Sequence, residues 1–130
     1  MAHTVAVDPR AGRVTLTVRG EFGLAEARAA FDAFVSHPDF VPGMDLLCDL
    51  REAVMRPRPG EVEALVRHIH GRSERRGRGY RVAFVVAGSF EQAIIDAFRG
   101  SGLVLPEAVR IFTRPDEAAA WLAEPHEQPA

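Results

Sequence analysis

Hydrophobic and polar positions follow one another in this chain as blocks that predict strands and helices in turn. The most apolar block covers residues 80–87, and its six successive residues 82–87 carry no polar side chain. A strand that is apolar on both faces is usually covered by helices on both sides. We therefore expect residues 80–87 to form the central strand of an α/β sheet.

The blocks before this strand predict a hairpin, two helices and a second buried strand. Residues 4–7 and 14–18 predict a β-hairpin near a sheet edge, because residues 14–18 alternate strictly between apolar and polar. A helix is expected over 24–35, and a buried strand over 44–50. An irregular loop over 51–59 then leads into a long helix that starts at Gly60, with Pro57 and Pro59 stiffening the loop.

Three further elements are predicted after residue 87. Ser89 and Gln92 have the spacing of a capping box, which indicates the start of a helix. Residues 108–112 predict a short last strand, and Pro115 suits the first position of a last helix.

This order predicts an α/β fold with a small mixed, mainly parallel five-stranded sheet. The sheet consists of the N-terminal hairpin plus βα units, and about four helices pack on it. Neither an internal repeat nor a linker interrupts the pattern. We expect one domain over residues 1–124, followed by a frayed C-terminal tail over 125–130.

Composition narrows the class of protein. The 130 residues are 47% hydrophobic and 26% charged, as in an ordinary soluble globule. No apolar run approaches the ~18 residues of a membrane span, and the first residues lack a signal pattern, so we expect a cytoplasmic protein.

The single cysteine, Cys48, lies in a predicted strand and fits a small buried hydrophobe. All 16 basic residues are arginine, which a GC-rich bacterial genome explains, so arginine clusters are weak evidence for nucleic-acid binding.

The C-terminal segment supplies the most specific pattern. Residues 109–112 (VRIF) are followed by 114–118 (RPDEA) and 120–122 (AWL). Together with the order of elements, this ending resembles the SpoIIAA-like family of the STAS (sulfate transporter and anti-sigma antagonist) superfamily. The resemblance implies a small mixed sheet with helices packed on it. It also implies a non-enzymatic module that binds a protein partner, or a lipid or other small apolar ligand.

One branch of the STAS superfamily carries a phosphorylated Ser or Thr in an Asp-Ser-Ser/Thr-Gly motif after the third strand. The matching residues 57–60 here read PRPG, so only Gly60 of the motif is present. No serine or threonine lies between Ser36 and Ser73. The phosphorylation switch is therefore not carried over, and the sigma-factor pathway is not implied.

The edge after the second buried strand is where we expect a site. In open α/β sheets ligands bind beyond the carboxyl ends of the strands. The candidate residues for binding a ligand or partner there are Asp49, Arg51, Met55, Arg56 and Arg58. Two alternatives stay open: Asp49 satisfies only backbone donors of a neighbouring turn, and Met55 roofs the core instead of lining a pocket.

Other functions receive less support from the residues. Residues 56–81 hold eight arginines against three glutamates, a local charge of +5 that suits phosphate, although the chain as a whole carries −2 and no aromatics are interleaved. His68 and His70 are two apart and point to different helix faces, so no metal site is expected. Ser89 lacks the Gly-x-Ser-x-Gly pattern of hydrolases.

We interpret the chain as a bacterial, non-enzymatic module that binds an unknown protein partner or a small ligand, lipid-like ligands included. No catalytic residue, metal, cofactor or membrane span is expected, and nucleic acid is not the expected partner. A small enzyme of unknown reaction, and phosphate or nucleic-acid binding through residues 56–81, are the alternatives. A homodimer is also left open.

Overall fold

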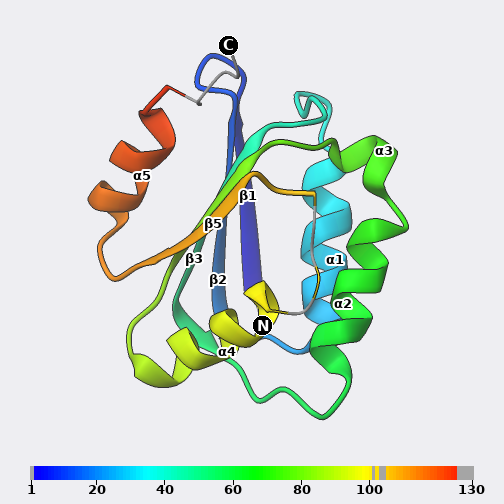
Figure 1. Cartoon of the computed structure of the whole chain (residues 1–130), viewed down its shortest axis with the longest axis vertical. Helices are drawn as coiled ribbons and strands as arrows, with labels where there is room; N and C mark the ends of the chain where they lie inside the picture. Colours follow the sequence, from blue (N-terminus) through cyan, green and yellow to red (C-terminus); the bar gives the residue numbers. More distant parts are fainter. Residues whose placement is uncertain (1, 101, 103–104, 126–130) are drawn as a thin grey trace.

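The computed structural model describes residues 2–100, 102 and 105–125 of the chain. Figure 1 shows a sheet with helices on both of its faces. In chain order the elements are β1 (Ala2–Asp8), β2 (Arg13–Glu21), α1 (Leu24–Val35), β3 (Asp45–Val54), α2 (Glu61–His70), α3 (Ser73–Arg76), β4 (Arg81–Val85), α4 (Ser89–Arg99), β5 (Ala108–Phe112) and α5 (Pro115–Ala123).

The sheet has the predicted class. Its five strands follow the order β1-β2-β3-β4-β5, with β1 and β2 antiparallel and the other neighbours parallel. The middle strand is β3, so the prediction that residues 80–87 are central was wrong. Strand β4 lies between β3 and β5 and is buried along its length. A run of apolar residues indicates that both faces of a strand are covered. A strand can be covered in this way without being the middle strand of the sheet.

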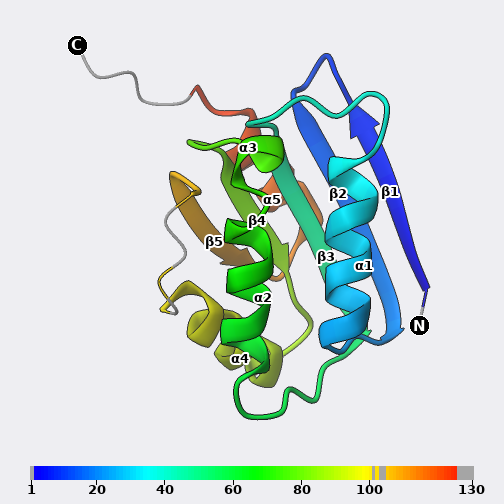
Figure 2. The same cartoon turned by 90° about the vertical axis from the view of Figure 1, so that its right-hand side faces the viewer.

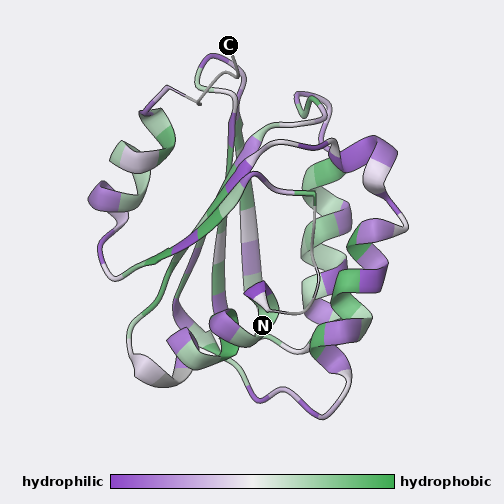
Figure 3. Ribbon diagram, viewed as in Figure 1, coloured by the Kyte–Doolittle hydropathy of each residue, from purple (hydrophilic) through white to green (hydrophobic). Residues whose placement is uncertain are grey.

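Helices cover both faces of the sheet, but more of them pack on one face than on the other. Helices α1, α2 and α4 pack on one face, and α5 packs on the other (Figures 1 and 2). Side chains of β3 alternate between the two faces, so Cys48 and Leu50 belong to the core under the three helices, and Leu47 to the smaller core under α5. Figure 3 shows the hydrophobic residues of α1 and α2 on the sides of the helices nearest the sheet.

Strand β3 is longer than the sequence predicts. Residues 51–54 were expected to begin an irregular loop, but they continue the strand, and Ala53 and Val54 pair with Gly20 and Glu21 of β2. The register shifts between Thr17 and Arg19, so β3 has an additional residue there and the ladder resumes beyond it. The loop that carries the candidate site is therefore shorter than predicted and begins after β3.

Two helix boundaries also differ from the predictions. Gly88 caps α4 in an extended conformation, and Ser89 is already the first helical residue without a side-chain capping bond, so the predicted capping box was wrong. Helix α2 ends at His70, and the four-residue helix α3 follows it without a sequence prediction. The remaining four helices are the expected ones. Residues 126–130 of the expected tail lie outside the described residues.

Candidate functional site

An apolar cavity of about 150 Å³ lies between the sheet and the layer of α1, α2 and α4. Its sheet wall includes Leu16 of β2, Cys48 of β3 and Phe84 of β4. The helix walls include Phe31 of α1 and Ile69 of α2. A dry cavity of this size, lined by Leu, Ile and Phe side chains, holds a molecule as large as benzene.

Aromatic rings and small side chains together produce this cavity. Phe84 and Phe98 meet edge to face with ring centroids 5.9 Å apart, and Phe31 and Phe34 do so at 5.1 Å. The first pair joins the sheet wall to α4, and the second stiffens the α1 wall. Ala27 is a buried small residue of α1 that also lines the cavity. A small residue among bulky ones leaves space that neighbouring side chains do not fill.

The cavity opens at the edge where the parallel strands end. Its deep wall includes Phe34 and Leu50, which are 2% and 1% exposed. The lining residues Leu24 and Val62, which begin α1 and α2, are only half-buried, and Pro57 in the loop before α2 is exposed. This is the edge at which ligands enter open α/β sheets.

Among the described residues that line the cavity, Glu61 is the one charged side chain. Its Oε1 accepts the backbone N–H of Arg58 at 2.7 Å, which ties the loop to the start of α2. Glu61 is half-buried and is the first residue of α2, next to the exposed loop at the mouth.

Cys48 lies deeper and is 3% exposed. Burial raises the pKa of its thiol far above the usual value, so the group stays protonated and forms part of the apolar wall. It is also the only cysteine of the chain. That makes it a natural reporter for occupancy of the cavity.

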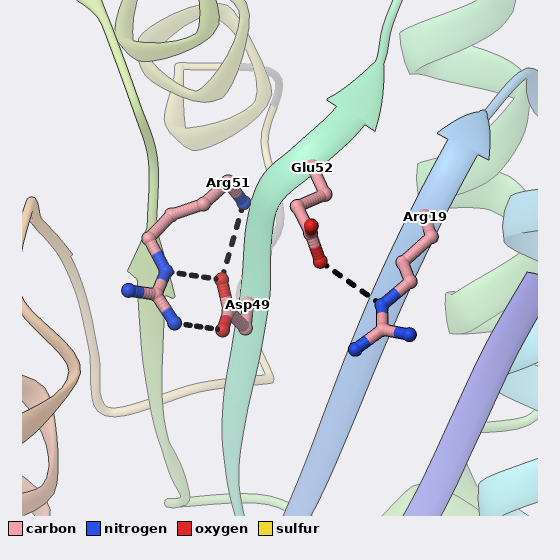
Figure 4. Close-up of polar contacts among 4 residues, drawn as sticks. All are labelled: Arg19, Asp49, Arg51 and Glu52. Carbon is pink, nitrogen blue, oxygen red and sulfur yellow. Dashed lines mark hydrogen bonds and ion pairs between the residues drawn. The ribbon is translucent and has the colours of Figure 1, made fainter.

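The structure separates the five predicted site residues: three lie on two opposite faces of the sheet, and the other two lie on the loop before α2. Asp49 and Arg51 lie on the face of α5, and Figure 4 shows them paired beside Arg19 and Glu52. Met55 is buried and lines the cavity on the other face. Met55 belongs to the buried core and also lines the cavity, so the geometry fits both alternatives.

Asp49 already has a complete set of partners. Nε and Nη2 of Arg51 donate to its two carboxylate oxygens at 2.9 and 2.8 Å, and the Arg51 backbone N–H donates at 3.1 Å. These bonds hold the pKa of Asp49 below its usual value, and they raise the pKa of Arg51. The alternative of backbone donors in a neighbouring turn is met only in part, because the one backbone donor, Arg51, lies in β3 and the other two bonds come from its side chain. A ligand here would have to displace a forked ion pair.

Arg56 and Arg58 lie on the loop near the cavity mouth, and both are exposed. Nη1 of Arg56 lies 3.3 Å from the carboxylate of Glu21, a pair in which both side chains are more than two thirds exposed. Neither arginine lines the cavity. Whether these two residues bind a partner stays a prediction.

Much of the arginine-rich segment 56–81 supports the fold. Arg76 is 1% exposed, stacks 3.2 Å above the ring of Tyr80 and donates to the Met44 carbonyl, and burial lowers its pKa to about 10. Arg81 donates to the Trp121 and Glu124 carbonyls at the end of α5. The charge of +5 read from the sequence is therefore not one open basic face.

The part of the chain that the structure describes offers no cluster of metal ligands. No group of three His, Cys, Asp or Glu side chains there lies close enough to hold a metal ion. His68 instead places Nε2 at 2.9 Å from the carboxylate of Asp32. Within the same residues, none of the helices has the length and apolar character needed to cross a membrane.

Fold and cavity together define a class of protein. It is a small α/β module whose mixed sheet carries three helices and an apolar cavity on one face, and a single helix on the other. No protein-family model matches this chain, and neither does any curated protein sequence.

Solved structures do match it. One of them is the crystal structure of an uncharacterized protein of the DUF3478 family from Shewanella loihica PV-4, which has a SpoIIAA-like fold. The two chains superpose with a TM-score of 0.59 at 14% identity, over 93% of this chain and 92% of the other. This chain therefore has a SpoIIAA-like fold, as its C-terminal pattern predicts.

Proposed function

We propose that this protein is a non-enzymatic binding module that holds a small apolar ligand in the cavity between its sheet and helices α1, α2 and α4. The observation that carries the proposal is the preformed cavity of about 150 Å³, which opens at the carboxyl edge of the sheet. Ligand pockets are typically preformed and mostly apolar, with few polar groups at defined places. The proposal includes a cytoplasmic location for the protein, as the sequence predicts.

An enzyme would need a nucleophile with a base, or a metal, beside the bound molecule. The cavity offers a protonated, buried thiol at Cys48 and a carboxylate at Glu61. A thiol is a nucleophile only as thiolate, and burial opposes that form here. Binding without chemistry is therefore the function that this lining supports.

The first experiment asks whether a small hydrocarbon enters the cavity. The full chain is treated with a small thiol reagent, methyl methanethiosulfonate, with and without toluene. Because the buried Cys48 thiol stays protonated in the closed fold, its modification is followed by intact mass until it is complete without toluene, and its rate reports how often the fold opens. We expect toluene to slow the modification and to raise the thermal midpoint, because a ligand that binds only the folded state stabilises it.

A pair of variants on α1 locates the effect. Ala27→Leu adds a side chain to the cavity, whereas Ala29→Leu adds the same side chain at an exposed position two residues away. We expect Ala27→Leu to abolish toluene binding and to keep or raise stability, since it fills a void. Ala29→Leu should bind toluene as the unaltered chain does. Equal binding by both variants would contradict the proposal.

A further inference from the structure

The chemical class of the ligand follows from the mouth of the cavity, on the assumption that the proposed function holds. A ligand in this cavity buries its apolar part against Leu16, Phe31 and Phe84 and leaves one end at the opening. Glu61 is the one charged residue of the described lining, and it begins α2 beside that opening. We propose that Glu61 makes the cavity selective for a small apolar amine, whose ammonium group binds this carboxylate.

Glu61 has an acceptor left for such a ligand. Its Oε1 receives the Arg58 backbone N–H at 2.7 Å, and this bond fixes the side chain at the mouth. An ionised carboxylate offers about four acceptor positions on two oxygens, so one backbone bond leaves room for an ammonium donor. The bond also pre-organises the carboxylate, which lowers the ordering cost of binding.

An anionic ligand end would meet less favourable surroundings. A carboxylate placed at this opening would stand beside Glu61, and two close like charges are unfavourable in a partly buried site. The positive end of α2 is already balanced by Glu61 and Glu63 in its first turn. Arg56 is paired with Glu21, and the Arg56 and Arg58 side chains are outside the lining.

The test uses four ligands that share one ring and differ at one end: toluene, benzyl alcohol, benzylamine and benzoate. Affinities for the full chain are measured by isothermal titration calorimetry at neutral pH, and repeating them on Ala27→Leu locates each ligand. We expect benzylamine to bind about tenfold more tightly than benzyl alcohol, because a charge-assisted hydrogen bond is stronger than a neutral one. Benzoate should bind most weakly.

Glu61→Gln and Glu63→Gln are the matched variants. Both remove one negative charge from the first turn of α2, but only Glu61 lines the cavity. Glutamine at position 61 still offers an oxygen to the Arg58 N–H, so the loop keeps its attachment. Glu61→Gln should remove the preference for benzylamine and leave toluene affinity unchanged. Glu63→Gln should leave all four affinities in the same order.

Failure of this inference is distinct from failure of the proposed function. If toluene binds and protects Cys48 but benzoate binds as tightly as benzylamine, the amine selectivity is wrong and the cavity still binds apolar molecules. If Glu63→Gln changes the order as much as Glu61→Gln does, a general charge effect replaces the specific contact and the inference is again wrong. If none of the four ligands binds or protects Cys48, both proposals are wrong.

Discussion

Replacing Phe84 by alanine should remove about 3 kcal/mol of unfolding free energy. The ring is 9% exposed, meets Phe98 edge to face at 5.9 Å, and its residue pairs with Cys48 on β3. Truncation of a buried phenylalanine costs about 3 to 5 kcal/mol from lost transfer energy and the space left behind. Because one side of the ring already borders the cavity, it has fewer contacts to lose, and we expect the lower end of that range.

Urea unfolding measures the loss, with the m-value checked for constancy. Val85→Ala on the same strand is the control, because Val85 is fully buried on the opposite face under α5. Both variants should be less stable, but only Phe84→Ala should enlarge the cavity and admit naphthalene, which is larger than toluene. A loss below about 1 kcal/mol for Phe84→Ala would refute the packing described for β4. Naphthalene binding by Val85→Ala would refute the assignment of the two faces.

Three further predictions concern the residues around β3 and α2. The double substitution Arg56→Ser and Arg58→Ser should change the unfolding free energy by less than about 0.5 kcal/mol in urea titration, since exposed ion pairs stabilise little. Equal pull-down of a partner or ligand by this variant would contradict the sequence-based hypothesis that these arginines bind it. With Asp49→Asn, the unfolding free energy should fall less steeply as the pH becomes acidic. Arg51 lowers the pKa of Asp49 in the folded chain, so the ionised carboxylate stabilises the fold at neutral pH and this contribution is lost as the pH falls below about 4. Urea unfolding between about pH 3 and pH 6 measures this change, and equal slopes for both proteins would exclude the linkage. Incubation with an anti-sigma kinase and ATP should add no phosphate to residues 51–61, which contain no hydroxyl side chain, and intact mass with peptide mapping would reveal any exception.

The fold was accessible from the sequence because its signals are local. Alternation in β2, helical spacing in α1 and the proline at the start of α5 each report on their own element. Crossover rules then join these elements into a mainly parallel sheet. The position of β3 in the middle of that sheet was not predicted, because its charged second half, from Arg51 to Val54, looks like a loop.

The pairing of Asp49 with Arg51 could have been predicted. Residues two apart in a strand project from the same face, so opposite charges at these positions meet when the strand continues through them. Ending the predicted strand at Leu50 concealed this relation, and the two residues were assigned to a shared ligand site with Met55. The extended β3 puts Met55 in the cavity lining on the opposite face instead.

The cavity itself leaves no periodic signal in the sequence. Its lining comes from three strands, three helices and the segments before α1 and α2, and its existence depends on how far the helices stand from the sheet. Small residues on buried faces, such as Ala27 and Cys48, are a partial sign. They become informative only when the aromatic side chains opposite them have been placed.

An apolar cavity in the core has a cost that bears on function. Side chains that face a cavity of about 150 Å³ have no packing partners on that side, so they contribute less to the stability of the fold than fully packed side chains do. A ligand at about 100 times its dissociation constant adds about 2.7 kcal/mol to the folded state. The same space that weakens the unliganded chain is therefore a source of binding energy, and occupancy of the cavity should be visible as stability before any partner is known.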